Sequence, residues 1–166
     1  MSKPIEQIQR KRVFFIDFFN TLIDFRKVMP SLTPGAELFL ETVRENGMET
    51  HLVSNSNNIF VDKVLDNFKI KVFFNYITTK DEVSRGKPFP DIYKLALKKS
   101  NVDTMKGLAI EDNYRGYIAA STAGLQTIIL SPYEKSRKSV KEKIIRDSDR
   151  KHPLLFIKDF HNLITE

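Results

Sequence analysis

The chain of 166 residues contains no cysteine. It therefore has no disulfide, no thiolate metal site and no cysteine nucleophile, and this absence is typical of cytoplasmic proteins. No apolar run approaches the roughly 20 residues that span a bilayer, and the polar N-terminal arm at residues 1–11 lacks the apolar core of a signal peptide. We therefore expect a cytoplasmic protein that has no membrane partner.

The composition is that of an ordinary globular protein, with 41% hydrophobic and 29% charged residues. The length predicts a single domain over residues 1–166. The formal net charge is +6, and much of it comes from a basic amphipathic segment at residues 133–152, in which Val140 and Ile144 mark the apolar face of a helix. A solvated helix face is the simplest interpretation of this segment, and an anionic partner is the alternative. Oligomerisation stays possible.

Strand-like and helix-like segments alternate along the chain. Strands are expected at residues 12–16, 50–53, 72–77, 107–110, 126–130 and 154–157. Helices are expected at residues 37–45, 58–68, from 91 onward, at 115–123 and within 133–152, with a closing turn at 159–164. Such alternation predicts an α/β fold, a three-layer, doubly wound parallel sheet of the Rossmann type.

Four short motifs predict where the chemistry lies. The first is Asp17 with Thr21, directly after the first apolar strand. The others are Ser54-Asn55, the run Gly86-Lys87-Pro88-Phe89-Pro90, and Glu111-Asp112. Each falls at a predicted strand end or helix start, and the carboxyl ends of parallel strands meet at one edge of a sheet. Each motif alone is common, whereas all four in this order form a strong joint signal.

Residue type indicates what these groups can do. A carboxylate such as that of Asp17 can attack phosphorus, and Lys87 can neutralise both the nucleophile and the phosphoryl oxygens. Mg²⁺ prefers oxygen ligands, which Asp17, Asp112 and Glu111 can supply. Two simpler interpretations stay open: Ser54-Asn55 could cap the following helix, and Glu111-Asp112 could be an ordinary N-cap pair.

The four motifs together resemble those of the haloacid-dehalogenase-like (HAD) hydrolases, and they cover nearly the whole chain. The nearest likeness is to the subfamily that includes sugar-phosphate phosphatases and phosphoglucomutases. The resemblance implies a Mg²⁺-dependent phosphohydrolase that acts through an aspartyl-phosphate, with Asp17 and Lys87 as the catalytic pair. It implies phosphate-binding roles for Thr21, Ser54, Asn55 and Lys87. It implies metal ligands from Asp17, the backbone carbonyl of Phe19, Glu111 and Asp112.

Phe19 departs from the family pattern, which places a second aspartate two residues after the nucleophile. In the phosphatases of the family that residue protonates the leaving oxygen and later activates water, and phenylalanine can do neither. Loss of a positioned general acid–base costs about 10²–10⁴-fold in rate. We therefore predict a weak or specialised phosphohydrolase. A catalytically inactive pseudoenzyme that binds phosphate or a partner is the main alternative, and a dehalogenase or phosphonatase-type hydrolase is a further one.

The spacing of the motifs leaves no room for a cap domain. The interval from Leu22 to Pro34 fits a helical turn and a hairpin flap, and the interval from Ser54 to Lys87 is filled by one helix and one strand. We expect an open site that admits phosphorylated substrates up to macromolecular size.

Overall fold

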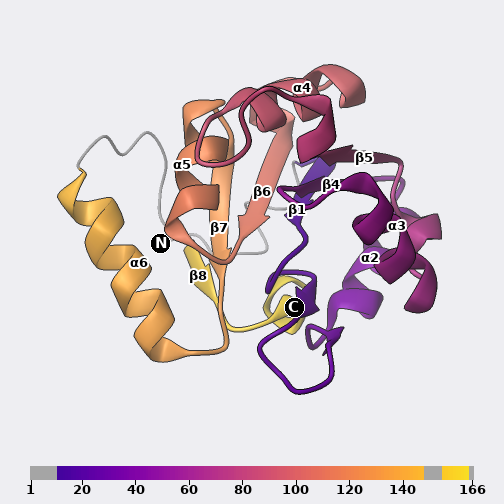
Figure 1. The fold of residues 1–166 in the computed structure, drawn as a ribbon, viewed down its shortest axis with the longest axis horizontal. Coiled ribbons are helices and arrows are strands. Elements are labelled where there is room, and N and C mark those ends of the chain that lie inside the picture. The colour runs from indigo at the N-terminus through magenta and orange to yellow at the C-terminus, as the bar shows by residue number, and fades with distance from the viewer. Residues whose placement is uncertain (1–10, 148–154, 165–166) are drawn as a thin grey trace.

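A six-stranded parallel sheet forms the centre of the computed structural model, which describes residues 11–147 and 155–164 (Figure 1). The strand order is β5-β4-β1-β6-β7-β8, and every neighbouring pair runs parallel. The strands are β1 (Val13–Asp17), β4 (Glu49–Ser54), β5 (Tyr76–Thr79), β6 (Gly107–Glu111), β7 (Gln126–Leu130) and β8 (Leu155–Ile157). The predicted α/β fold with a doubly wound parallel sheet is confirmed.

Helices cover both faces of this sheet, which gives three layers (Figure 1). One face packs against α2 (Ala36–Glu45) and α3 (Asn58–Asn67), together with the closing 3-10 turn at Phe160–Leu163. The other face packs against α4 (Asp91–Ser100), α5 (Tyr114–Thr122) and α6 (Glu134–Arg146). The helix α6 lies within the predicted amphipathic segment and buries Val140 and Ile144, as its pattern predicted.

The central strand β1 explains why the first apolar run has no polar alternation. Phe14 and Ile16 pack into the core beneath α2 and α3, whereas Val13 and Phe15 pack into the core beneath α4 and α5. A parallel strand that is covered on both faces must be apolar on both. Asp17 is the last residue of this strand, so the fold delivers its carboxylate to the edge of a fully buried sheet.

The third predicted strand, at residues 72–77, is wrong in its position. Residues Lys71–Phe73 form a 3-10 turn, and the strand β5 begins only at Tyr76. The side chain of Asn75 accepts a hydrogen bond from the backbone N–H of Thr50 at 3.0 Å, which fixes the turn against the start of β4. A short apolar run does not distinguish a strand from a turn that packs on the core.

Two intervals that could hold a cap domain are short. Between β1 and α2 the chain forms a hairpin of β2 (Ile23–Asp24) and β3 (Ser31–Leu32), which is the predicted flap. Between Ser54 and Lys87 lie α3, β5 and two 3-10 turns. Within the described residues neither interval contains a cap domain, in agreement with the spacing of the motifs.

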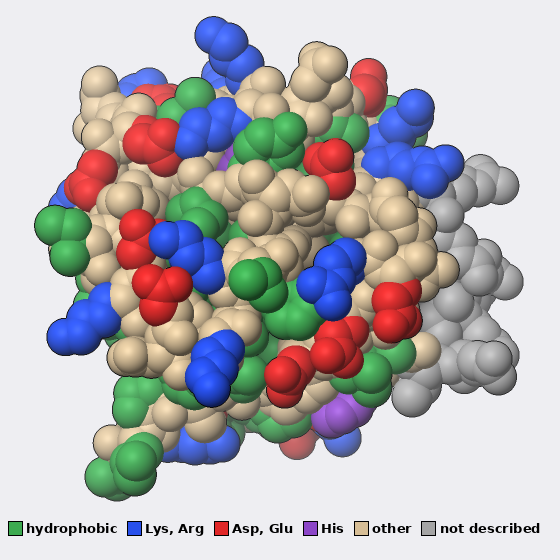
Figure 2. Space-filling view, turned by 90° about the vertical axis from the view of Figure 1, so that its right-hand side faces the viewer, with side chains coloured by type: hydrophobic (Ala, Val, Ile, Leu, Met, Phe, Trp, Pro, Cys, Tyr) green, Lys and Arg blue, Asp and Glu red, His purple; other side chains and the backbone are tan. Residues whose placement is uncertain are grey.

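Parts of two predicted segments lie outside the described residues, namely 1–10 of the N-terminal arm and 148–152 of the basic segment. None of the helices in the described part of the chain combines the length and apolar character that crossing a bilayer requires. On the face shown in Figure 2, acidic and basic side chains are interspersed rather than gathered by sign. This face therefore presents no strong field of one sign.

His51 in β4 is a buried, neutral core group. Its ring nitrogens lie 2.7 Å from the hydroxyls of Ser100 and Thr78, and its ring packs between Phe15 and Tyr76. Burial, with a smaller contribution from the positive charge of Lys99, lowers the pKa of His51 to about 3. The folded state therefore resists protonation of this ring, whereas the unfolded chain does not.

We expect this difference to destabilise the protein in mild acid. Between pH 6.5 and about 3 only the unfolded state binds the proton, so His51 should lower the free energy of unfolding by about 1.4 kcal/mol per pH unit. Urea titrations at pH 7.5 and pH 5.0 measure the free energy of unfolding. Between these two pH values, the free energy of unfolding of His51→Gln should fall by about 2 kcal/mol less than that of the wild type. His161→Gln controls for the removal of a histidine as such. An equal fall in the free energy of unfolding of the wild type and His51→Gln would contradict the conclusion that the buried ring is neutral.

Candidate active site

The carboxyl ends of β1, β4 and β6 surround a cavity of about 290 Å³ together with the loop before α4. All four sequence motifs contribute to its wall. The lining residues are Asp17, Phe19, Asn20, Ser54, Asn55, Ser56, Lys87, Asp112, Asn113, Arg115 and Gly116. Two further predicted residues, Thr21 and Glu111, are fully buried next to this wall. The fold thus brings the predicted site residues together.

Lys87 is the centre of this cluster. Its ammonium lies 2.6 Å from Asp17 Oδ1 and 2.6 Å from Glu111 Oε1, and it donates to the backbone carbonyl of Val53 at 2.8 Å. Although burial by itself lowers the pKa of Lys87, the carboxylates of Asp17 and Glu111 raise it above its ordinary value. The side chain is therefore a buried cation that links β1, β4 and β6.

The loop that carries Lys87 is held by Asn55. The Asn55 amide accepts from the backbone N–H of Lys87 at 2.8 Å and donates to its carbonyl at 3.0 Å. The Arg115 guanidinium donates to the same carbonyl at 2.9 Å. A Cβ at Gly86 would lie 2.5 Å from Asn55 Oδ1, so glycine at this position permits the contact. The phosphate-binding role of Asn55 stays a prediction, and its amide already serves to position Lys87.

Asp17 is held from a second side by Thr21. The hydroxyl of Thr21 donates to Asp17 Oδ2 at 2.9 Å, so both carboxylate oxygens are hydrogen-bonded. Ser54 lines the cavity, and its hydroxyl accepts from the backbone N–H of Ser56 at 3.0 Å. The contacts of Thr21 and Ser54 place both hydroxyls at this edge of the sheet, and their roles toward phosphate stay predictions.

Both helix-cap interpretations of the motifs are wrong. The N-cap of α3 is Asn57, whose side chain accepts from the backbone N–H of Phe60, rather than Ser54-Asn55. The N-cap of α5 is Asn113, rather than Glu111-Asp112. The polar residues of the second and fourth motifs are therefore not needed to begin these helices.

Glu111 is a fully buried carboxylate that has one unsatisfied oxygen. Its Oε1 accepts hydrogen bonds from Lys87 and from the hydroxyl of Tyr93. Its Oε2 has no hydrogen-bond partner among the described residues, and a Cβ at Gly116 would lie 1.9 Å from it. Burial and the nearby Asp17 carboxylate raise the pKa of Glu111. Such an orphaned buried oxygen is a site where an ion or water is expected.

The hydrogen bond from Tyr93 to Glu111 was not predicted from the sequence. The signal was available, because a tyrosine on a buried helix face needs a hydrogen-bond acceptor in the core. Arg115 was also missed as a partner of the Lys87 loop. An exposed arginine in the first turn of a helix carries no comparable signal.

The arrangement of three carboxylates fits a divalent cation. Asp17, Glu111 and Asp112 each offer an oxygen, and these oxygens lie within 4.8 Å of one another. When ionised, three negative charges face the one positive charge of Lys87, which leaves two uncompensated. Burial and the charge of Asp17 also raise the pKa of Asp112. A hard, oxygen-seeking cation such as Mg²⁺ would balance this excess.

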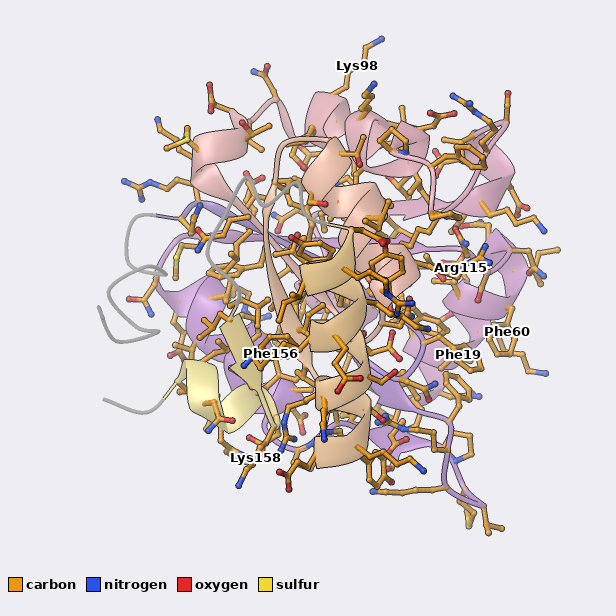
Figure 3. The ribbon with its side chains drawn as sticks, turned by 90° about the vertical axis from the view of Figure 1, so that its left-hand side faces the viewer. Phe19, Phe60, Lys98, Arg115, Phe156 and Lys158 are labelled. Carbon is orange, nitrogen blue, oxygen red and sulfur yellow. The ribbon has the colours of Figure 1, made fainter. Side chains whose placement is uncertain are left out.

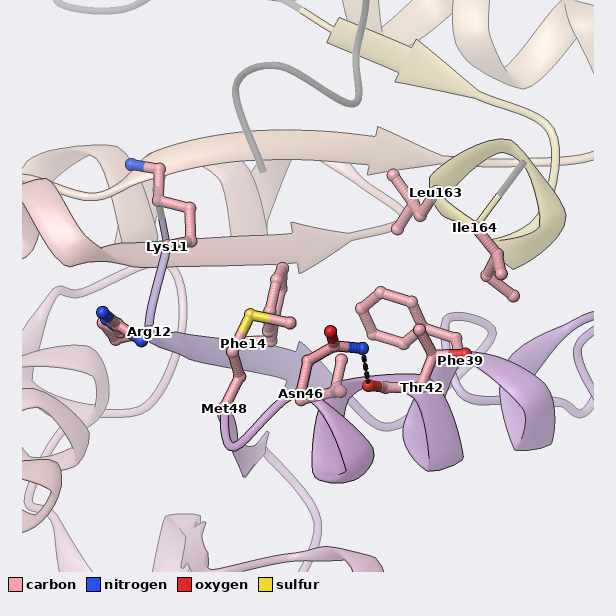
Figure 4. Close-up of a pocket in the computed structure, with 10 residues that line it drawn as sticks. Lys11, Arg12, Phe14, Phe39, Thr42, Asn46, Met48, Leu163 and Ile164 are labelled. Atoms are coloured by element: carbon pink, nitrogen blue, oxygen red, sulfur yellow. Dashed lines mark hydrogen bonds between the residues drawn. The ribbon is translucent and has the colours of Figure 1, made fainter. Parts of the chain in front are cut away.

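A second cavity, of about 280 Å³, lies at the opposite end of the central strands (Figure 4). Its wall includes Arg12, Phe14, Phe39 and Met48, and the described lining contains no carboxylate or imidazole. Of these two cavities, only the one at the carboxyl edge of the sheet is lined by carboxylates.

Comparison with known proteins agrees with this geometry. The family model described as haloacid dehalogenase-like hydrolase matches residues 3–130. The chain belongs to this family. The structure has the HAD-like fold that the four motifs implied. The subfamily of sugar-phosphate phosphatases and phosphoglucomutases stays a prediction.

Relatives of this HAD-like chain include phosphatases. The phosphoglycolate phosphatase of Pseudomonas fluorescens is 28% identical over 118 residues, which are 71% of this chain and 43% of the relative. The bifunctional riboflavin kinase/FMN phosphatase of Arabidopsis thaliana is 33% identical over 115 residues, which are 69% of this chain and 29% of the relative. The chain thus spans less than half the length of these curated relatives.

Solved structures share the fold at low identity. The structure of CbbY from Rhodobacter sphaeroides in complex with phosphate superimposes with a TM-score of 0.73 and 16% identity, and the match covers 93% of this chain and 100% of that chain. This similarity concerns the fold alone.

We predict that Mg²⁺ stabilises this HAD-like chain through the three carboxylates. With a dissociation constant of about 1 mM, 10 mM Mg²⁺ would add about 1.4 kcal/mol to the free energy of unfolding. Asp112→Asn should be more stable than the wild type without Mg²⁺, because repulsion is relieved, and should gain little when Mg²⁺ is added. Urea titrations at matched ionic strength measure both effects.

The matched control is Asp66→Asn, which removes an exposed carboxylate from α3. It should keep the full response to Mg²⁺. An equal response in Asp112→Asn and Asp66→Asn would contradict a metal site at these carboxylates.

Proposed function

We propose that this chain hydrolyses phosphomonoesters through an aspartyl-phosphate on Asp17. The observation that carries the proposal is that both oxygens of the Asp17 carboxylate are held by neighbouring side chains at the cavity wall. Lys87 binds one of its oxygens at 2.6 Å and Thr21 binds the other at 2.9 Å. These two contacts hold an ionised carboxylate in one orientation, which is the requirement for a carboxylate nucleophile.

The remaining residues supply charge and position. The phosphoryl group would contact Lys87 and Ser54, which line the same cavity as Asp17. The carboxylates of Asp17, Glu111 and Asp112 would hold Mg²⁺, with the backbone carbonyl of Phe19 as a further expected ligand. Bound Mg²⁺ supplies charge neutralisation for the phosphoryl oxygens. The curated phosphatase relatives support this assignment for the family, and the chain's own residues support it for this site.

The chemistry proceeds in two displacements at phosphorus. In the first, a bond forms between Asp17 and phosphorus while the bond from phosphorus to the leaving oxygen breaks. In the second, a water oxygen attacks phosphorus, the bond to Asp17 breaks, and inorganic phosphate is released. Phe19 has no proton to give in the first step and accepts none in the second, so we propose slow turnover or a specialised substrate.

A second groove lies beside the proposed site and could hold part of a larger substrate. A groove of about 410 Å³ adjoins the proposed catalytic cavity and shares Asn20, Asp112 and Asn113 with it. Arg26 and Lys135 line this groove, so it offers positive charge next to the phosphate site. We propose that an anionic part of a larger substrate binds in this groove. Lys135 belongs to the basic segment at residues 133–152, for which an anionic partner was the alternative interpretation.

The direct test is p-nitrophenyl phosphate hydrolysis with Mg²⁺ for the wild type, Asp17→Asn and Phe19→Asp. Nitrophenolate leaves without a proton, so the wild type should give a burst followed by slow turnover. Phe19→Asp should raise steady turnover about 100-fold, because it supplies the missing acid–base group. Asp17→Asn should remove both the burst and the turnover.

Two results would overturn the proposal. If all three proteins are inert and none responds to Mg²⁺, the chain is a binding module rather than an enzyme. If the wild type instead releases halide from a 2-haloacid in the presence of a chelator, the dehalogenase alternative holds.

A further inference from the structure

A stacked pair of aromatic rings, of which the outer one is exposed, lies beside the catalytic cavity. Phe19 lines the cavity and is 44% exposed. Its ring stacks on that of Phe25, with centroids 4.1 Å apart and planes 9° from parallel. Figure 3 shows that Phe19 lies toward the same edge of the molecule as Phe60 and Arg115, and Arg115 lines the same cavity. The exposed ring is therefore available to stack on a planar group of a ligand in the cavity.

The chain holds this pair in a fixed position. Asn20 adopts a positive φ of 61° between the two rings in sequence, and its side-chain oxygen accepts from the backbone N–H of Phe25 at 3.1 Å. The inner ring, Phe25, also packs near Phe18 and Phe60, with centroids 5.8 and 6.0 Å away. The outer ring of Phe19 is therefore a preformed surface, and a ligand ring that stacks on it loses little to ordering of the protein.

The cavity offers no obvious proton to a leaving oxygen. Asp17, Glu111 and Asp112 are assigned to nucleophile and metal roles. The rest of the described lining consists of amides, hydroxyls, glycine, the Phe19 ring, Lys87 and Arg115, and it contains no further carboxyl group or imidazole. The leaving group must then depart as an anion. A phenol has a pKa of about 10, so phenolate departs far more readily than an alkoxide.

We propose that Phe19 and Phe25 form a leaving-group subsite for aryl phosphates, in which the aromatic ring is bonded directly to the ester oxygen. The proposal rests on the proposed function and names its substrate class. Asp17 bonds to phosphorus, the bond from phosphorus to the aryl oxygen breaks, and the phenolate takes its proton from water. Stacking on Phe19 positions the ring whose oxygen departs. Phenyl phosphate and a phosphotyrosyl side chain share this chemistry.

The experiment compares kcat/KM for three phosphates with Mg²⁺. Phenyl phosphate has the ring and the good leaving group, benzyl phosphate has the ring but releases an alkoxide, and cyclohexyl phosphate has neither. Phenyl phosphate should exceed benzyl phosphate by about 100-fold or more, because only the alkoxide needs the missing acid. A phosphotyrosine peptide in parallel distinguishes a protein substrate from a small aryl phosphate.

The variants separate stacking from chemistry. Phe19→Leu should lower kcat/KM for phenyl phosphate about fivefold more than it lowers that for acetyl phosphate, which has no ring and a leaving group that needs no proton. Phe19→Trp should restore the difference. Tyr76→Leu removes a ring that is similarly exposed, at 37%, on the edge strand and should leave both substrates unchanged.

The outcomes distinguish this inference from the proposed function. If acetyl phosphate phosphorylates Asp17 but phenyl, benzyl and cyclohexyl phosphates react alike, or Phe19→Leu affects phenyl and acetyl phosphates equally, the subsite is overturned and the phosphohydrolase stands. If no substrate labels Asp17, both fall. If light scattering shows that Phe19→Leu turns a dimer into a monomer, a second copy covers the rings and the subsite is overturned.

Discussion

The buried ammonium of Lys87, held between the carboxylates of Asp17 and Glu111, is the contact on which the carboxyl edge of the sheet depends. Three strands meet there, and each contributes a carbonyl or carboxylate oxygen to the same nitrogen. Removing one partner from a buried ion cluster leaves the others uncompensated, which costs several kcal/mol. The chain accordingly fixes the Lys87 loop through Asn55 and leaves room for that contact at Gly86.

One cation does not neutralise three carboxylates, and this imbalance connects stability with function. The raised pKa values of Glu111 and Asp112 express the cost of gathering negative charge in a buried place. A site selected only for stability would carry fewer charges. The proposed divalent cation would offset this excess of negative charge.

The sequence predicted the site more fully than it predicted the side-chain contacts within it. Asp17, Ser54 and Asp112 could be placed together because parallel strands deliver their carboxyl ends to one edge. Two side-chain contacts could not be predicted, namely the hydrogen bond from Tyr93 to Glu111 and the stacking of Phe19 on Phe25. They depend on how a helix and a hairpin pack, which the spacing of apolar residues in the sequence does not encode. The prediction of a strand at residues 72–77 was wrong for a related reason, because the first of these apolar residues form a 3-10 turn that packs on the core.

Phe19 links the missing acid–base group to the open entrance of the cavity. Without a cap domain in the described residues, the groups around the proposed nucleophile would have to provide selectivity as well as chemistry. A carboxylate at position 19 would serve a wide range of leaving groups, because it lowers the barrier for poor ones. A ring there supplies contact area and no proton, so the identity of the leaving group decides the rate. Phe19, which we propose slows general phosphate hydrolysis, would thereby narrow the range of substrates. Selectivity would then arise from leaving-group chemistry rather than from an enclosing domain.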